Sequence, residues 1–119
     1  MGRMSRQKGK RGEREAAAEL AVVFACDARR GVQYQGGPDS PDVVLEGVNV
    51  HVEAKRVEAL NLYAAIEQAH NDASGKIPLV WHRRNGKPSV VIIETQNLLR
   101  LAREIVESQE RCERVQKSL

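Results

Sequence analysis

The apolar positions of this 119-residue chain follow two periods, and the longer one predicts three helices. We expect these helices over residues 11–27, 62–73 and 97–117, each with one apolar stripe. Asn61 is placed to cap the second helix and Ser74-Gly75 to end it. The stripes consist of Ala16, Ala17, Leu20, Val23 and Phe24, then Leu62, Ala65, Ile66, Ala69 and Ala73, and finally Leu98, Leu101, Ile105 and Cys112.

The shorter period, in which alternate residues are apolar, predicts the two strands of a hairpin, and short apolar runs predict three more strands. Residues 28–36 predict a short edge strand followed by a loop, and residues 42–55 predict a hairpin. Residues 77–82 predict a strand with a proline near its start, where strands tolerate it. The run 89–94 is almost wholly apolar, which is typical of a strand buried on both faces, and residues 83–87 form a basic turn before it. The expected fold is α/β, a central mixed sheet flanked by helices in the order α-β-β-β-α-β-β-α.

The predicted hairpin sorts its side chains onto two unlike faces. Gly47-Val48 suits a two-residue type II′ loop, which makes Glu46 and Asn49 neighbours across the ladder. Counting back from this loop sets Asp42 opposite Glu53. The apolar face then carries Val43, Leu45, Val50, Val52 and Ala54, and the other face carries Asp42, Val44, Glu46, Asn49, His51, Glu53 and Lys55.

This register gives the polar face a candidate chemistry. Asp42 and Glu53 become like charges with Cβ atoms about 5 Å apart. Carboxylates so placed repel each other unless a cation lies between them or one of them is protonated. Lys55 follows on the same face, and two acids beside a lysine suit metal-assisted hydrolysis of a phosphodiester. The alternative is a solvated sheet face, which is the common role of exposed acidic and basic residues.

Three further polar residues have two interpretations each. Glu13 continues the apolar stripe of the first helix, so it either turns out to solvent near the helix start, where acids are favoured, or reaches into a site. Gln68 flanks the stripe of the second helix and on local grounds is a surface residue. His51 precedes Glu53 on the polar face, although a lone histidine on a strand is more often structural than a ligand.

Basic residues gather at the start of the chain, although the formal net charge is only +3. Residues 1–10 predict a flexible basic arm before a single domain over residues 11–119. Such an arm commonly follows a polyanion, and a solubilising tail is the alternative. The expected nucleic-acid contacts are Arg3, Arg6, Lys8, Lys10, Arg11 and Arg14, together with Arg29, Arg30, Ser40, Arg83 and Arg84, for which a plain surface or backbone role is the alternative.

Composition narrows the class of protein. The two cysteines, Cys26 and Cys112, give neither a zinc spacing nor a disulfide framework. Aromatic residues make up only 3% of the chain, so the core must rest on Val, Leu, Ile and Ala. The chain starts without an apolar signal segment, and no apolar run reaches the length of a membrane span. We therefore expect a soluble, intracellular and cytoplasmic protein.

The ordered set of motifs resembles the PD-(D/E)XK nuclease superfamily. More narrowly, it resembles the small Holliday junction resolvases of archaea and their phage or bacterial relatives. The resemblance covers roughly residues 8–94. Residues 8–15 are similar to the basic, glycine-containing opening of the family, residues 36–42 to its loop into the catalytic aspartate, and Glu53-Ala54-Lys55 to its Glu-x-Lys motif.

This resemblance implies a restriction-endonuclease-like sheet and a role for each site residue. Asp42 and Glu53 would ligate Mg²⁺ or Mn²⁺ together with the backbone carbonyl of Ala54. Lys55 would orient or activate the attacking water. The remaining implied site residues are Glu13, which would complete the acidic site, and Gln68, which would support it.

The implied function is that of a metal-dependent DNA endonuclease in recombination or repair. The expected substrate is a four-way junction or other branched DNA, cut by a homodimer. The helix over residues 97–117 is longer than in the resolvases, which bears on the dimer. The alternatives are a nicking or repair nuclease of the same superfamily on non-junction DNA, and a basic DNA-binding module whose acidic face is structural.

Overall fold

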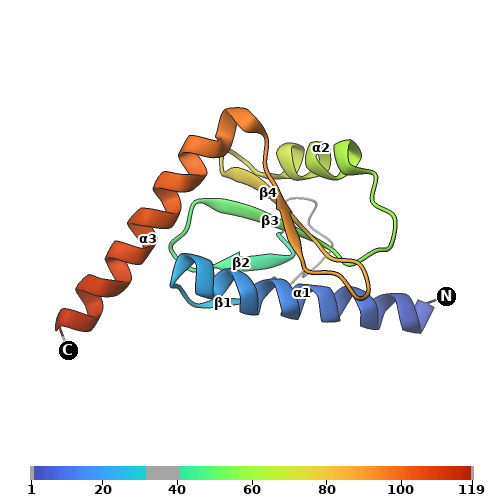
Figure 1. Ribbon diagram of the computed structural model, residues 1–119, viewed down its shortest axis with the longest axis horizontal. Helices are drawn as coiled ribbons and strands as arrows, with labels where there is room; N and C mark the ends of the chain where they lie inside the picture. The colour runs from blue at the N-terminus through green and yellow to red at the C-terminus, as the bar shows by residue number, and fades with distance from the viewer. Residues whose placement is uncertain (1, 32–40, 119) are drawn as a thin grey trace.

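A mixed sheet forms the centre of the molecule, and its strands follow one another in sequence order (Figure 1). The computed structural model describes residues 2–31 and 41–118, with side chains from residue 9 onward. The five strands are β1 (Ala28–Arg30), β2 (Val43–Leu45), β3 (Val50–Lys55), β4 (Ile77–His82) and β5 (Val90–Ile92). β3 and β4 run parallel, and the other neighbouring strands run antiparallel.

Three helices accompany the sheet: α1 (Gly2–Phe24), α2 (Leu62–Asp72) and α3 (Leu98–Ser118), the last preceded by the short 3₁₀ helix η2 (Thr95–Asn97). α1 and α2 lie on opposite faces of the sheet, and α3 passes the sheet end and continues beyond it (Figure 1). These elements confirm the predicted α/β class and the order α-β-β-β-α-β-β-α.

The alternation of side chains along β4 divides the core between the two faces. Ile77, Leu79 and Trp81 belong to the cluster that α1 covers with Ala16, Leu20 and Phe24. Val80 points to the other face and packs with Ala65, Ile66 and Ala69 of α2. Pro78 lies opposite His51 of β3, whereas β5 pairs only with Val80–His82 of β4. The N–H that Pro78 lacks is therefore not needed for pairing with β5. α2 thus covers the face of β3 that carries His51 and Glu53.

The hairpin between β2 and β3 has the predicted register but a different turn. Val43 lies opposite Val52, as counting predicts. The amide of Val48 donates to the carbonyl of Leu45 (3.3 Å), and Gly47 has φ +73°. This is the type II pattern, with glycine at the third turn position, rather than a type II′ turn on Gly47-Val48. The amide of Asn49 binds Glu104 of α3, not a partner on β2, which opens the loop.

The first helix begins earlier than the sequence predicts. α1 starts at Gly2, so residues 2–10 are helical rather than a flexible arm. This segment lacks proline, and its arginine, lysine, glutamine and methionine residues have good helix propensity. The segment also contains Gly2 and Gly9, which have poor helix propensity, and it has no apolar stripe, so the hydrophobic pattern gives no signal for these first turns.

The last strand is an exposed edge, not the strand buried on both faces that its composition predicts. Val90 and Val91 are 52% and 49% exposed. β5 is the final strand in the sheet order and pairs only with β4. A run of apolar residues therefore does not by itself distinguish an inner strand from an edge strand.

The predicted stripes are mostly correct, and their exposed members lie near helix ends. Val23, Leu62 and Leu98 are exposed, and each lies in the first or last two residues of its helix. In α2, the side chain of Asn61 accepts a hydrogen bond from the amide of Ala64, and positive φ values at Ser74 and Gly75 follow the helix, as predicted. No described helix has the length and apolar character that crossing a membrane requires.

Candidate functional site

The β2–β3 hairpin brings the carboxyl groups of Asp42 and Glu53 together. The amide of Asp42 donates to the carbonyl of Val52 (2.9 Å), which continues the Val43–Val52 register to the next pair. The amide of Ala54 donates to Oδ2 of Asp42 (2.9 Å), and the Asp42 carboxyl is hydrogen bonded to that of Glu53. The two side chains therefore point to the same face, with their carboxyl groups in hydrogen-bond contact.

Their environments move the two pKa values in opposite directions. Burial raises the pKa of Asp42 to about 7, and the charge of Glu53 adds to this effect. Burial also acts to raise the pKa of Glu53, but hydrogen bonds from His51 and Asp42 outweigh it and lower that pKa below its ordinary value. Below pH 7 the proton of the pair therefore resides on Asp42, and Glu53 is the ionised member.

Lys55 and Gln68 meet beside this pair. Nζ of Lys55 donates to Oε1 of Gln68 at 3.0 Å, which joins the end of β3 to α2. The charge of Lys55 is among the effects that lower the pKa of Glu53. Gln68 is exposed, as its place beside the apolar stripe predicts, and its side chain also contacts the lysine of the Glu-x-Lys motif.

Glu13 approaches the site instead of turning out to solvent. Its Oε2 accepts a hydrogen bond from Nε of Arg30 at 2.9 Å, and its side chain is only 19% exposed. Its negative charge contributes to the raised pKa of Asp42. The structure therefore favours the interpretation in which Glu13 belongs to the acidic site, and it makes Arg30 the ion-pair partner of that acid.

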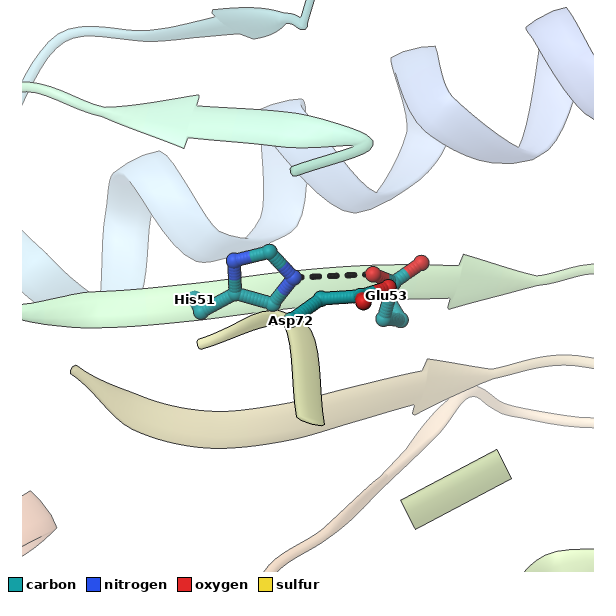
Figure 2. A group of neighbouring side chains, drawn as sticks. All are labelled: His51, Glu53 and Asp72. Carbon is teal, nitrogen blue, oxygen red and sulfur yellow. Dashed lines mark hydrogen bonds and ion pairs between the residues drawn. The ribbon is translucent and has the colours of Figure 1, made fainter. Parts of the chain in front are cut away.

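His51 and Asp72 extend the acidic site on the other side of Glu53. Nε2 of His51 lies 2.8 Å from Oε1 of Glu53, and the two side chains are 2% and 4% exposed (Figure 2). One ligand atom from each of His51, Glu53 and Asp72 lies within 4.8 Å of the others, so the three form a group that can hold a metal ion. The remaining predicted metal residues, Asp42, Ala54 and Glu13, lie outside this group of three.

The sequence pattern did not predict a role for Asp72, and it predicted mainly a structural role for His51. One local signal was present, because Asp72 follows Gln68 by four residues and so lies one turn further along the same helix face. That face is the one α2 turns toward β3, which only the packing of the helix on the sheet reveals.

The predicted nucleic-acid contacts fall into groups. The ion-paired members are Arg11 (with Glu15), Arg29 (with Glu46), Arg30 (with Glu13) and Arg83 (with Glu15). Lys10, Arg14 and Arg84 are exposed and form no ion pair with another described residue. Arg3, Arg6 and Lys8 lie in the first turns of α1, and Ser40 lies outside the described residues.

Glu15 joins three parts of the chain beside the site, although its place off the apolar stripe predicts a solvated residue. It accepts hydrogen bonds from Arg56, which directly follows Lys55, and from Arg83 in the β4–β5 turn, at 2.9 and 2.6 Å. Burial acts to raise the pKa of Glu15, but these two arginines outweigh it and lower that pKa. Gly12 is needed here, because a Cβ at this position would lie 2.8 Å from Cβ of Arg56.

Comparisons of the chain with protein-family models, with curated proteins and with solved structures find no match. The resemblance to the nuclease superfamily therefore rests on the sequence motifs and stays a prediction.

Proposed function

We propose that the protein is a metal-dependent DNA endonuclease that hydrolyses phosphodiester bonds at the site of Asp42, Glu53 and Lys55. The observation that carries the proposal is the carboxyl pair, in which the Asp42 and Glu53 carboxyl groups contact each other while the amide of Ala54 donates to Asp42. Glu53 is buried and Asp42 is half-buried, so the two acids repel each other strongly when both are ionised, and a divalent cation offsets that repulsion.

The donor set fits Mg²⁺ or Mn²⁺. Carboxylate oxygens are the preferred ligands of these hard cations, and Asp42 and Glu53 supply them, with the Ala54 carbonyl as the further candidate ligand. A cation bound there supplies charge that stabilises the transition state of phosphodiester hydrolysis and makes a bound water more acidic.

The chain's own groups then have separable tasks. Gln68 fixes Nζ of Lys55, so that the ammonium can orient a water molecule and offset charge on the phosphate oxygens. Glu13, held by Arg30, adds negative charge that favours cation binding. Against the effect of burial, hydrogen bonds from His51 and Asp42 lower the pKa of Glu53, which favours the ionised form that a cation requires.

The substrate proposal is DNA in a branched form, above all a four-way junction. Lys10 and Arg14 on α1 and Arg84 in the β4–β5 turn are exposed cations. The bonds of Glu15 to Arg56 and Arg83 hold α1 and this turn together at the end of β3 that carries Lys55. Contacts of this type bind phosphate without reading bases. A homodimer would place two such sites about a two-fold axis and cut two opposed strands.

Cleavage assays with Asp42→Asn and Glu53→Gln test the proposal. We expect Mg²⁺-dependent cleavage by the wild type, its loss with chelator, and a loss of at least about a hundredfold in each variant. DNA binding should survive or tighten, because each variant removes negative charge near the phosphate. Glu46→Gln, an acid on the exposed part of the same hairpin, is the matched control and should cut normally.

The choice of DNA separates the alternatives. Faster cutting of a four-way junction than of a linear duplex supports a resolvase, and equal cutting of both supports a nicking or repair nuclease. If both acid variants cut at the wild-type rate, the site assignment is wrong. If the wild type binds DNA and never cuts it with Mg²⁺ or Mn²⁺, the protein is a DNA-binding module.

A further inference from the structure

We propose that His51, Glu53 and Asp72 bind a second divalent cation, of the borderline class that includes Zn²⁺ and Mn²⁺, outside the Asp42–Glu53 pair. This site goes beyond the proposed nuclease function and shares only Glu53 with it.

The three ligands come from two elements that are packed together. His51 and Glu53 are two residues apart on β3, so their side chains lie on the same face of the strand. Asp72 is the last residue of α2, which covers this face. Figure 2 shows the Asp72 carboxyl next to Glu53, with the imidazole of His51 directed at one Glu53 oxygen while the other Glu53 oxygen points away from His51. One oxygen of Glu53 thus faces His51, and the other is directed away from it.

The electrostatics at this point favour a cation. Glu53 is buried, and a carboxylate oxygen of Asp72 lies within 4.8 Å of one of its carboxylate oxygens. Asp72 also stands at the C-terminus of α2, where the helix dipole disfavours negative charge. No hydrogen bond or ion pair joins Asp72 to another residue within the described part of the chain, so no side chain there neutralises it.

The kind of cation follows from the ligand atoms. One imidazole nitrogen and two carboxylate oxygens suit Zn²⁺ and Mn²⁺ better than Mg²⁺ or Ca²⁺, which prefer oxygen alone. Ligand atoms about 2.0–2.2 Å from a four-coordinate ion lie roughly 3.4 Å apart. The His51 nitrogen and the Glu53 oxygen are 2.8 Å apart, so a small opening of their hydrogen bond admits the ion.

Such a cation would fasten the end of α2 to the middle of β3. It would hold Glu53 in one orientation while leaving its second oxygen to Asp42. It would also steady α2, which carries the Gln68 partner of Lys55. The site is therefore a positioning device for the acids and the lysine on β3.

Zn²⁺ titration followed by NMR of the histidine rings, with calorimetry to count sites, tests the inference. We expect the ring signals of His51 to shift in the wild type and also in Asp42→Asn, which lacks one acid of the pair. In Asp72→Asn the Zn²⁺ affinity measured at His51 should fall about tenfold or more. Glu67→Gln, which removes an exposed acid from the same helix, is the matched control and should bind Zn²⁺ as the wild type does.

Several results would overturn this inference. One is that the ring signals of His51 do not move on addition of Zn²⁺, or that only those of His70 and His82 move. Another is that Asp72→Asn binds Zn²⁺ at His51 as tightly as the wild type does. His51→Gln identifies the ring signals, and Asp72→Asn decides the matter alone if the His51 variant fails to fold. Zn²⁺ binding at His51 in a protein that never cuts DNA refutes only the nuclease proposal. Cleavage lost on acid substitution, without Zn²⁺ at His51, refutes only this second site.

Discussion

At the scale of single residues, the pairing of Asp42 with Glu53 is the feature on which the chemistry depends. The sequence predicted this pair because the alternation of side chains on a hairpin follows from its register alone. It did not predict that Glu53 is also bonded to His51 and lies near Asp72, because those contacts depend on which helix covers the second face. The local pattern was sufficient to predict the pair of acids and insufficient to predict that His51 and Asp72 lie against Glu53.

The raised pKa of Asp42 predicts how stability depends on pH. The pKa is about 7 in the folded protein against an ordinary 3.8, so between these values only the folded chain holds this proton. Its contribution to the free energy of unfolding is largest at low pH and is lost as the pH rises to about 7. From pH 5 to pH 7, in chelator, the wild type should lose about 2 kcal/mol relative to Asp42→Asn, as measured by urea unfolding.

Two features make this comparison specific. The lowered pKa of Glu53 contributes a constant stabilisation above its ordinary value of 4.5, and this contribution changes with pH only below that value, outside the chosen range. Glu46→Gln controls for removing an acid from the hairpin and should follow the wild type. A constant difference between the wild type and Asp42→Asn from pH 5 to pH 7 would show that Asp42 has no raised pKa.

The same proton competes with the proposed catalytic cation. Below pH 7 a cation must displace it from Asp42, so the Mg²⁺ affinity should fall by roughly tenfold for each pH unit and level off above pH 7. Calorimetry at pH 5.5, 6.5, 7.5 and 8.5 measures this change. An affinity that does not change over this range would mean that Mg²⁺ does not bind at Asp42.

At the scale of elements, α2 supplies Asp72 to the second proposed cation site and Gln68 to Lys55, and its N-cap is the simplest point at which to weaken it. The Asn61 side chain accepts a hydrogen bond from the amide of Ala64 at 3.1 Å. Asn61→Ala should lower the free energy of unfolding by about 1 kcal/mol, as measured by urea unfolding. Asn71→Ala, an exposed asparagine in the same helix, is the control and should change stability less. Equal losses in both variants would argue against the cap.

The elements also show where sequence prediction was reliable. α2 and β4 were predicted nearly residue for residue, because a cap, a helix-ending Ser-Gly pair and a proline mark their limits locally. β5 has equally clear composition, yet its place at the sheet edge depends on the order of all five strands. The start of α1 was missed because its first turns carry no apolar stripe.

At the scale of the whole molecule, the ion pairs determine which basic residues can meet a polyanion. Arg83 and Glu15 are 68 residues apart in sequence and only 2.6 Å apart in the fold, so no local pattern reveals that Arg83 is already paired. Arg30 is likewise held by Glu13. Lys10, Arg14 and Arg84 form no ion pair with another described residue and are exposed, and they are the better candidates for phosphate contact.

This division predicts two kinds of arginine variant. Each phosphate contact contributes a slope of about −0.9 to the dependence of log binding constant on log salt, so Arg14→Gln and Arg84→Gln should each weaken DNA binding and make the slope shallower by about 1. Arg83→Gln should leave the slope nearly unchanged and instead lower the unfolding temperature, because it leaves Glu15 short of one partner. Fluorescence anisotropy of a four-way junction with the Asp42→Asn protein, over a series of KCl concentrations, measures the slope without cleavage. If Arg83→Gln changes the slope as much as Arg84→Gln does, DNA binding breaks the ion pair between Glu15 and Arg83, and Arg83 is part of the DNA-binding surface.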